Sequence, residues 1–137
     1  MRVADVMTED VLVVDEELPV RIAALLLLHH EIGGAPVVDV EGELIGVVSE
    51  ADLLAKEIFP PQGCGKAADT ARRRWSAVTV GELCSRPART TAPDVSLHDA
   101  AQMMREEGIA RLVVVAGSRI VGIITRYDIL KALAAPT

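Results

Sequence analysis

The chain carries one sequence pattern twice, and this internal repeat limits its fold more than any other feature. Gly46–Leu54 aligns with Gly122–Leu130, and Val3–Met7 aligns with Val80–Cys84. Each copy has fewer than about 60 residues, too few to bury a stable core alone. The repeat therefore predicts two similar units that share apolar surface within one small protein.

The hydrophobic pattern predicts the element order βαββα within each copy. The predicted elements are extended segments at Val11–Val14 and Ala88–Thr91, helices at Pro19–His30 and from Ser96, hairpins at Ala35–Val48 and Leu112–Ile124, and last helices from Ser49 and Thr125. The strands of both hairpins are continuously apolar and β-branched, which is typical of strands covered on both faces. We predict an α/β (α+β) fold in which two pseudo-two-fold-related βαββα repeats pack sheet to sheet.

The two long helices differ in how much of their surface is apolar. Ser96 is a good N-cap, and the helix after it carries one apolar stripe that ends in Met104, with Met103 also assigned to the core. In the first copy Ile22–Leu28 is apolar on all sides, so we expect that helix to be buried on more than one side. An aliphatic patch this large predicts a homodimer formed through helices, with Leu54 and Ile58 of a Glu50–Ile58 helix adding to it.

A connecting segment separates the copies. We divide the chain into residues 1–57 for the first repeat, 58–77 for the connection and 78–137 for the second repeat. Pro60–Gly65 predicts a loop, and Arg72–Trp75 follows on what the pattern allows to be a short helix. We expect this polar segment to be exposed and to be unsuited to a dimer interface.

Composition excludes several classes of function. The net charge of −6 and the single Trp, Tyr and Phe disfavour nucleic acid, which needs a positive surface and stacking side chains. Cys64 and Cys84 form no CxxC pair, and no apolar run is long enough to span a bilayer, so we expect a cytoplasmic protein without membrane contact. His29-His30 has no third ligand at metal spacing, and no catalytic set of acid and base residues is visible, so we expect neither a metal site nor an enzyme.

One pattern can carry binding chemistry: glycine, two apolar residues, Ser or Thr, any two residues, and Asp. It ends at Asp52 in the first copy and at Asp128 in the second, each time where a strand meets a helix. A carboxylate there can accept two hydrogen bonds at once, and the vicinal hydroxyls of a ribose are a natural pair of donors. The same spacing also makes an ordinary helix cap, and the two interpretations are compatible.

The doubled pattern resembles the tandem cystathionine β-synthase (CBS) domain pair, or Bateman module. The segments that carry the resemblance are Val3–Thr8, Gly33–Asp39, Gly46–Asp52 and Gly122–Asp128. It implies two clefts between the repeats that bind adenosine-containing ligands: AMP, ADP, ATP, S-adenosylmethionine or NAD. It also implies that the Asp holds the ribose, that the Ser or Thr holds ribose or phosphate, and that the other repeat clasps the adenine.

Carried over residue by residue, the resemblance assigns two unequal clefts. The first comprises Thr125, Arg126, Asp128, Val11, Ile32, Gly33 and Pro36, and the second comprises Ser49, Asp52, Ala88, Ile109 and Ala110. Arg126 can pair with a phosphate, whereas its counterpart Glu50 repels one. Pro36 has the counterpart Val113, a departure from the family pattern. Because Glu50 repels a phosphate and Val113 replaces the proline, the second cleft suits an uncharged nucleoside or is degenerate.

The sequence thus predicts a regulatory module that binds an adenine nucleotide as its ligand and needs no cofactor. A homodimer and an unidentified regulated protein are the expected macromolecular partners. The alternative is a structural dimerisation or scaffold module with vestigial clefts, which predicts that no ligand stabilises the protein.

Overall fold

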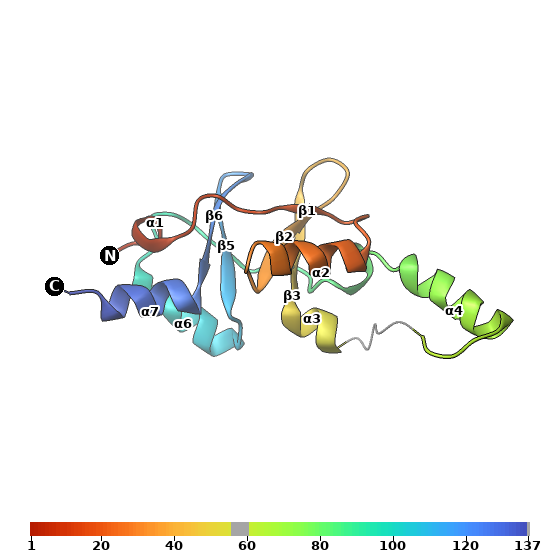
Figure 1. The fold of residues 1–137 in the computed structure, drawn as a ribbon. Coiled ribbons are helices and arrows are strands. Elements are labelled where there is room, and N and C mark those ends of the chain that lie inside the picture. The colour runs from red at the N-terminus through yellow and green to blue at the C-terminus, as the bar shows by residue number, and fades with distance from the viewer. Residues whose placement is uncertain (56–60, 137) are drawn as a thin grey trace. The chain divides into compact units, whose positions relative to one another are not determined.

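The computed structural model describes residues 1–55 and 61–136 and divides the chain into two compact units (Figure 1). One unit is Leu12–Pro87, called here the first-repeat unit. The other joins Met1–Val11 to Ala88–Thr137 and is called the second-repeat unit. The predicted end of a helix at Ile58 lies outside the described residues.

The first-repeat unit is a three-stranded sheet with helices. Its elements are β1 (Val14–Asp15), α2 (Val20–His29), β2 (Gly34–Val38), β3 (Leu44–Ser49), α3 (Glu50–Ala55), α4 (Lys66–Ser76) and α5 (Val80–Leu83). The sheet order is β1-β2-β3, with β1 parallel and β3 antiparallel to the central strand β2. Asp39 shapes the β2–β3 turn, because its Oδ1 accepts the backbone N–H groups of Glu41 (2.9 Å) and Glu43 (3.0 Å).

The second-repeat unit has the same topology. Its elements are α1 (Val3–Val6), β4 (Thr90–Thr91), α6 (Leu97–Glu107), β5 (Arg111–Ala116), β6 (Arg119–Thr125) and α7 (Arg126–Ala134). The sheet order is β4-β5-β6, with β4 parallel and β6 antiparallel to β5. Ser96 caps α6 as predicted, since its side chain accepts the Asp99 N–H (3.1 Å). The α6 helix ends at Gly108, whose φ of 64° favours glycine.

The predicted βαββα order is confirmed, with two differences at the start of each repeat. A short helix, α1 or α5, precedes the first strand and was not predicted. The first strands β1 and β4 have two residues each, fewer than the predicted Val11–Val14 and Ala88–Thr91. After β1 the chain turns at once, because the Leu18 N–H donates to the Asp15 carbonyl (3.0 Å).

The short helices α1 and α5 are exchanged between the sequence repeats. Val3, at the start of the first repeat, is buried in a core with Leu112, Val114 and Ile124 of the second. Val80 and Leu83, at the start of the second repeat, are buried in the core of the first-repeat unit. Each repeat therefore lacks part of its core when taken alone.

Burial differs from the sequence prediction in three places. Strand β2 is buried along its whole length and β5 at Leu112–Val114, but the outer strands β3 and β6 have mostly half-buried residues, so cover on both faces holds only for the central strands. In α2 only one stripe is buried: Leu25 is 51% and Leu28 75% exposed, so burial of this helix on more than one side is wrong for the single chain. Met104 is buried as predicted, whereas Met103, one position before it in α6, is 36% exposed and does not belong to the core.

The connecting segment is more regular than predicted. Residues 66–76 form the eleven-residue helix α4, so the short helix that the pattern allows at Arg72–Trp75 belongs to a longer helix that begins at Lys66. Arg72 bonds both the Asp69 carboxylate and the Gly63 carbonyl, which fastens the preceding turn to the helix. Among the described residues, no helix is long and apolar enough to cross a membrane.

Candidate functional site

The Ser49–Asp52 pair stands where β3 ends and α3 begins. The Asp52 carboxylate accepts the backbone N–H of Ser49 (2.9 Å) and the Ser49 hydroxyl (3.1 Å), both on Oδ2. The Ser49 hydroxyl in turn accepts the Asp52 N–H (3.3 Å). These bonds form a reciprocal helix cap, so the capping interpretation of the pattern is correct in this repeat.

Thr125 and Asp128 make the same arrangement at the start of α7. Oδ2 of Asp128 accepts the Thr125 N–H (2.9 Å) and hydroxyl (3.1 Å), and the Thr125 hydroxyl accepts the Asp128 N–H (3.2 Å). Asp128 is only 6% exposed. Its other oxygen, Oδ1, lies 3.9 Å from the Lys131 ammonium. The cap thus fixes one carboxylate oxygen, Oδ2, and makes no hydrogen bond to the other.

In each unit, a predicted residue just before the central strand hydrogen-bonds to the first residue of the capped helix. The Gly33 carbonyl accepts the N–H of Glu50 (2.9 Å), and Gly34 pairs with Ser49 across β2 and β3. In the second-repeat unit the Ala110 carbonyl accepts the N–H of Arg126 (3.0 Å).

Each unit therefore groups one set of predicted residues. The first-repeat unit holds Ile32, Gly33, Pro36, Ser49 and Asp52, and the second-repeat unit holds Ala88, Ile109, Ala110, Thr125, Arg126 and Asp128 together with Val11. The predicted clefts combine residues of both units, and that combination remains a prediction.

The remaining predicted residues differ in exposure. Arg126 and its counterpart Glu50 are exposed at the first position of their helices. Pro36 is fully buried and pairs with Val47, just as its counterpart Val113 pairs with Ile123. Pro36 is fully buried but does not belong to the core cluster that holds its neighbours Ala35 and Val37.

Sequence reasoning missed Ser85 as a residue of the candidate site. Its hydroxyl donates to Oδ1 of Asp52 at 2.6 Å, although the two residues lie 33 positions apart. Ser85 also exchanges two backbone hydrogen bonds with Val47 of β3 (2.9 and 3.0 Å). The available signal was positional, because Ser85 aligns with Thr8 in the first repeat.

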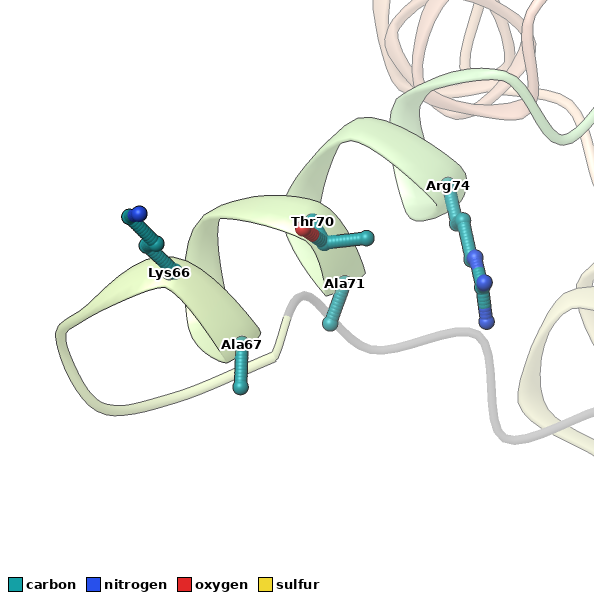
Figure 2. A pocket seen from close by; sticks show the side chains of 5 residues that line it. All are labelled: Lys66, Ala67, Thr70, Ala71 and Arg74. Atoms are coloured by element: carbon teal, nitrogen blue, oxygen red, sulfur yellow. The ribbon is translucent and has the colours of Figure 1, made fainter.

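A groove of about 640 Å³ lies apart from these residues, along α4 (Figure 2). Lys66, Ala67, Thr70, Ala71 and Arg74 line it. Figure 2 shows them along successive turns, with Lys66 near the start of the helix and Arg74 near its end. None of the predicted ligand contacts is among these residues, so this groove is separate from the candidate site.

The protein-family model of the CBS domain matches the chain twice, at residues 3–58 and 80–135. The chain belongs to the CBS domain family. It is a tandem CBS pair, as predicted, because the two matched segments correspond to the two sequence repeats.

Two curated relatives show how this CBS pair occurs elsewhere. YhcV, a CBS domain-containing protein of Bacillus subtilis, is 31% identical over 127 residues, which cover 93% of this chain and 81% of YhcV. The uncharacterized protein MJ1404 of Methanocaldococcus jannaschii is 33% identical over 135 residues, or 97% of this chain. This chain spans only 32% of the length of MJ1404, so it matches one part of that protein.

Solved structures confirm the mixed α+β fold. CBSX2 from Arabidopsis thaliana, solved in complex with AMP, is 30% identical with a TM-score of 0.77, covering 96% of this chain and 95% of that one. The CBS domain of a CBS domain containing membrane protein from Sphaerobacter thermophilus is 33% identical with a TM-score of 0.75, covering 96% and 86%.

Proposed function

We propose that this CBS pair is a regulatory module that binds an adenosine-containing ligand, with the carboxylate of Asp128 as the main ribose acceptor. The observation that carries this proposal is the geometry of Asp128. Its Oδ2 is held by the cap of α7, while Oδ1 takes no part in the cap and lies 3.9 Å from the Lys131 ammonium. A carboxylate fixed in this way needs little reordering to accept ligand hydroxyls, and its burial strengthens the bonds that it makes.

The comparison with CBSX2 supports an adenine nucleotide as the ligand. That protein was solved with AMP and shares the fold of this chain over nearly its whole length at 30% identity. Arg126 is exposed at the first position of α7, two residues before Asp128. A guanidinium there favours a phosphorylated ligand, so AMP, ADP or ATP fits better than adenosine.

We assign the regulatory effect to a change in the relation between the repeats. The predicted first cleft combines Asp128 with residues of the first repeat, so a ligand there would contact both. Such a ligand shifts a conformational equilibrium only by the difference in its affinity for the two states. We further propose that the protein is cytoplasmic and dimerises through the exposed leucines of its helices.

The scaffold function remains the second candidate, because one observation favours it. Both oxygens of Asp52 already accept hydrogen bonds within the chain, from Ser49 and from Ser85. A cleft built on Asp52 therefore starts with fewer free acceptors. If none of AMP, ADP, ATP, S-adenosylmethionine and NAD raises the melting temperature, the module is a scaffold.

Calorimetric titration with AMP tests the proposal on Asp128→Ala and Asp52→Ala. Losing the ribose acceptor should cost about 1.5–3 kcal/mol, or roughly ten- to a hundredfold in affinity, for Asp128→Ala. The effect of Asp52→Ala should be smaller. The two variants are matched, since each removes one equivalent helix cap. Equal losses, or a larger loss for Asp52→Ala, would contradict the role of Asp128.

A further inference from the structure

Asp52 differs from Asp128 in what its second carboxylate oxygen does. In both repeats Oδ2 caps a helix through equivalent bonds. In the first-repeat unit Oδ1 of Asp52 also accepts the Ser85 hydroxyl at 2.6 Å, the short distance of a charge-assisted bond. The counterpart oxygen of Asp128 lies 3.9 Å from the Lys131 ammonium, beyond hydrogen-bond distance.

The residue that aligns with Ser85 is Thr8, and its backbone lies in the same place in its own unit. Thr8 exchanges two backbone hydrogen bonds with Ile123 (both 2.9 Å), as Ser85 does with Val47 (2.9 and 3.0 Å). Thr8 also carries a hydroxyl. Within residues 1–55 and 61–136, however, no hydrogen bond joins the Thr8 hydroxyl to Asp128. The difference therefore lies in one side-chain contact, because the backbone frame is the same.

We propose that the Ser85 hydroxyl is a built-in competitor for the ligand at Asp52, a specificity-determining role that rests on the proposed function. It donates to the acceptor that a ribose hydroxyl would use, and so lowers the affinity of this site relative to that of Asp128. Ser85 is exposed, and its two backbone hydrogen bonds to Val47 do not depend on the orientation of its hydroxyl. A ligand can displace the hydroxyl without breaking the backbone bonds, so Ser85 sets the affinity and does not block the site.

Adenosine is the probe for this inference, because Glu50 at the first position of α3 repels a phosphate. Titrations are made on the full chain in an Asp128→Ala background, which leaves the Asp52 site to be measured. Adding Ser85→Ala should raise the affinity for adenosine about five- to tenfold, since one charged hydrogen bond no longer competes. Thr8→Ala is the matched control and should leave the affinity unchanged.

The outcomes separate this inference from the proposed function. If wild type binds AMP but Ser85→Ala leaves adenosine affinity unchanged or weaker, the competitor role is overturned and the proposed function stands. If no variant and no wild-type sample binds AMP or adenosine, both fall. Ser85→Cys, which keeps a similar size but donates weakly, repeats the test with the same expectation should Ser85→Ala fail to fold. Tighter binding by Ser85→Ala or Ser85→Cys, with none by Thr8→Ala, supports the inference.

Discussion

The α-carbon of Gly46 lies so close to the backbone of Ser85 that a Cβ added to Gly46 would come within 2.5 Å of the Ser85 carbonyl oxygen. The same Cβ would lie 3.0 Å from the Cys84 sulfur. Gly46 opens the repeated motif, and its counterpart Gly122 approaches Thr8 and Met7 in the same manner. The motif glycine therefore serves close backbone packing between the strand and the segment that follows the short helix.

Gly46→Ala should destabilise the protein more than Gly122→Ala. A Cβ at Gly46 meets a backbone oxygen at 2.5 Å, whereas at Gly122 the nearest atom is the flexible Met7 sulfur (2.7 Å) and the Thr8 oxygen lies at 2.9 Å. We expect Gly46→Ala to cost about 1–3 kcal/mol, which lowers the melting temperature by several degrees. Thermal melting of both variants measures this. A larger loss for Gly122→Ala would show that the Met7 side chain cannot move aside.

Leu83→Ala should destabilise the first-repeat unit, although Leu83 belongs to the second sequence repeat. Leu83 is 4% exposed and lies in the core with Val14 and Val37. Removing a buried leucine costs about 2–5 kcal/mol. Hydrogen exchange should show lost protection in β2 and β3 before β5. Val40→Ala, at a position that is 80% exposed, is the control and should change little. Loss of protection in β5 first would contradict the exchange of α5.

The sequence predicted the repeats because the two segments are similar to each other. It predicted the hairpins and the caps because each of these depends on residues that are close along the chain. Ser96, Ser49 and Thr125 all cap helices where their spacing to an acidic residue indicated. The exchange of α1 and α5 was not predictable in the same way. A short apolar segment such as Val3–Val6 shows that it will be buried, but its periodicity does not say in which core.

Two further features depend on contacts that a single sequence does not encode locally. The Ser85–Asp52 bond joins residues 33 positions apart through a hydroxyl that has many other possible acceptors. The exposure of Leu25 and Leu28 was missed because an apolar helix gives the same pattern whether its own chain or another chain covers it.

Arg126→Glu should abolish the preference for AMP over adenosine. Arg126 begins α7 beside Asp128, so reversing its charge replaces attraction for a phosphate by repulsion. The ratio of the two affinities is measured by calorimetry. Arg119→Glu is the matched control, since Arg119 is exposed at the opposite end of β6 and should leave the ratio unchanged. If Arg126→Glu retains the wild-type ratio, its side chain does not contact the phosphate.

The protein should be a homodimer whose interface is made by helices and not by the connecting segment. Leu25 and Leu28 of α2 and Leu54 of α3 are all more than half exposed in the single chain, as are Leu130 and Leu133 of α7. Leu25 and Leu28 share one face of α2, as Leu130 and Leu133 share one face of α7, and exposed apolar faces of this kind mark interaction surfaces. Light scattering should give twice the chain mass for wild type and a lower mass for Leu54→Glu, because burying a carboxylate in an apolar interface is costly.

Two controls test whether the dimer interface lies on these helices or elsewhere on the surface. Val40→Glu adds the same charge at a residue that is 80% exposed in the β2–β3 turn, so it should leave the dimer intact. Replacing residues 60–76 by a short glycine-serine linker should also leave it intact, because α4 presents mainly polar and charged side chains. A monomeric wild type contradicts the dimer outright. A dimer that survives Leu54→Glu but is lost with the linker would place the interface on α4, where Lys66 and Arg74 would then face a second copy of a chain whose net charge is −6.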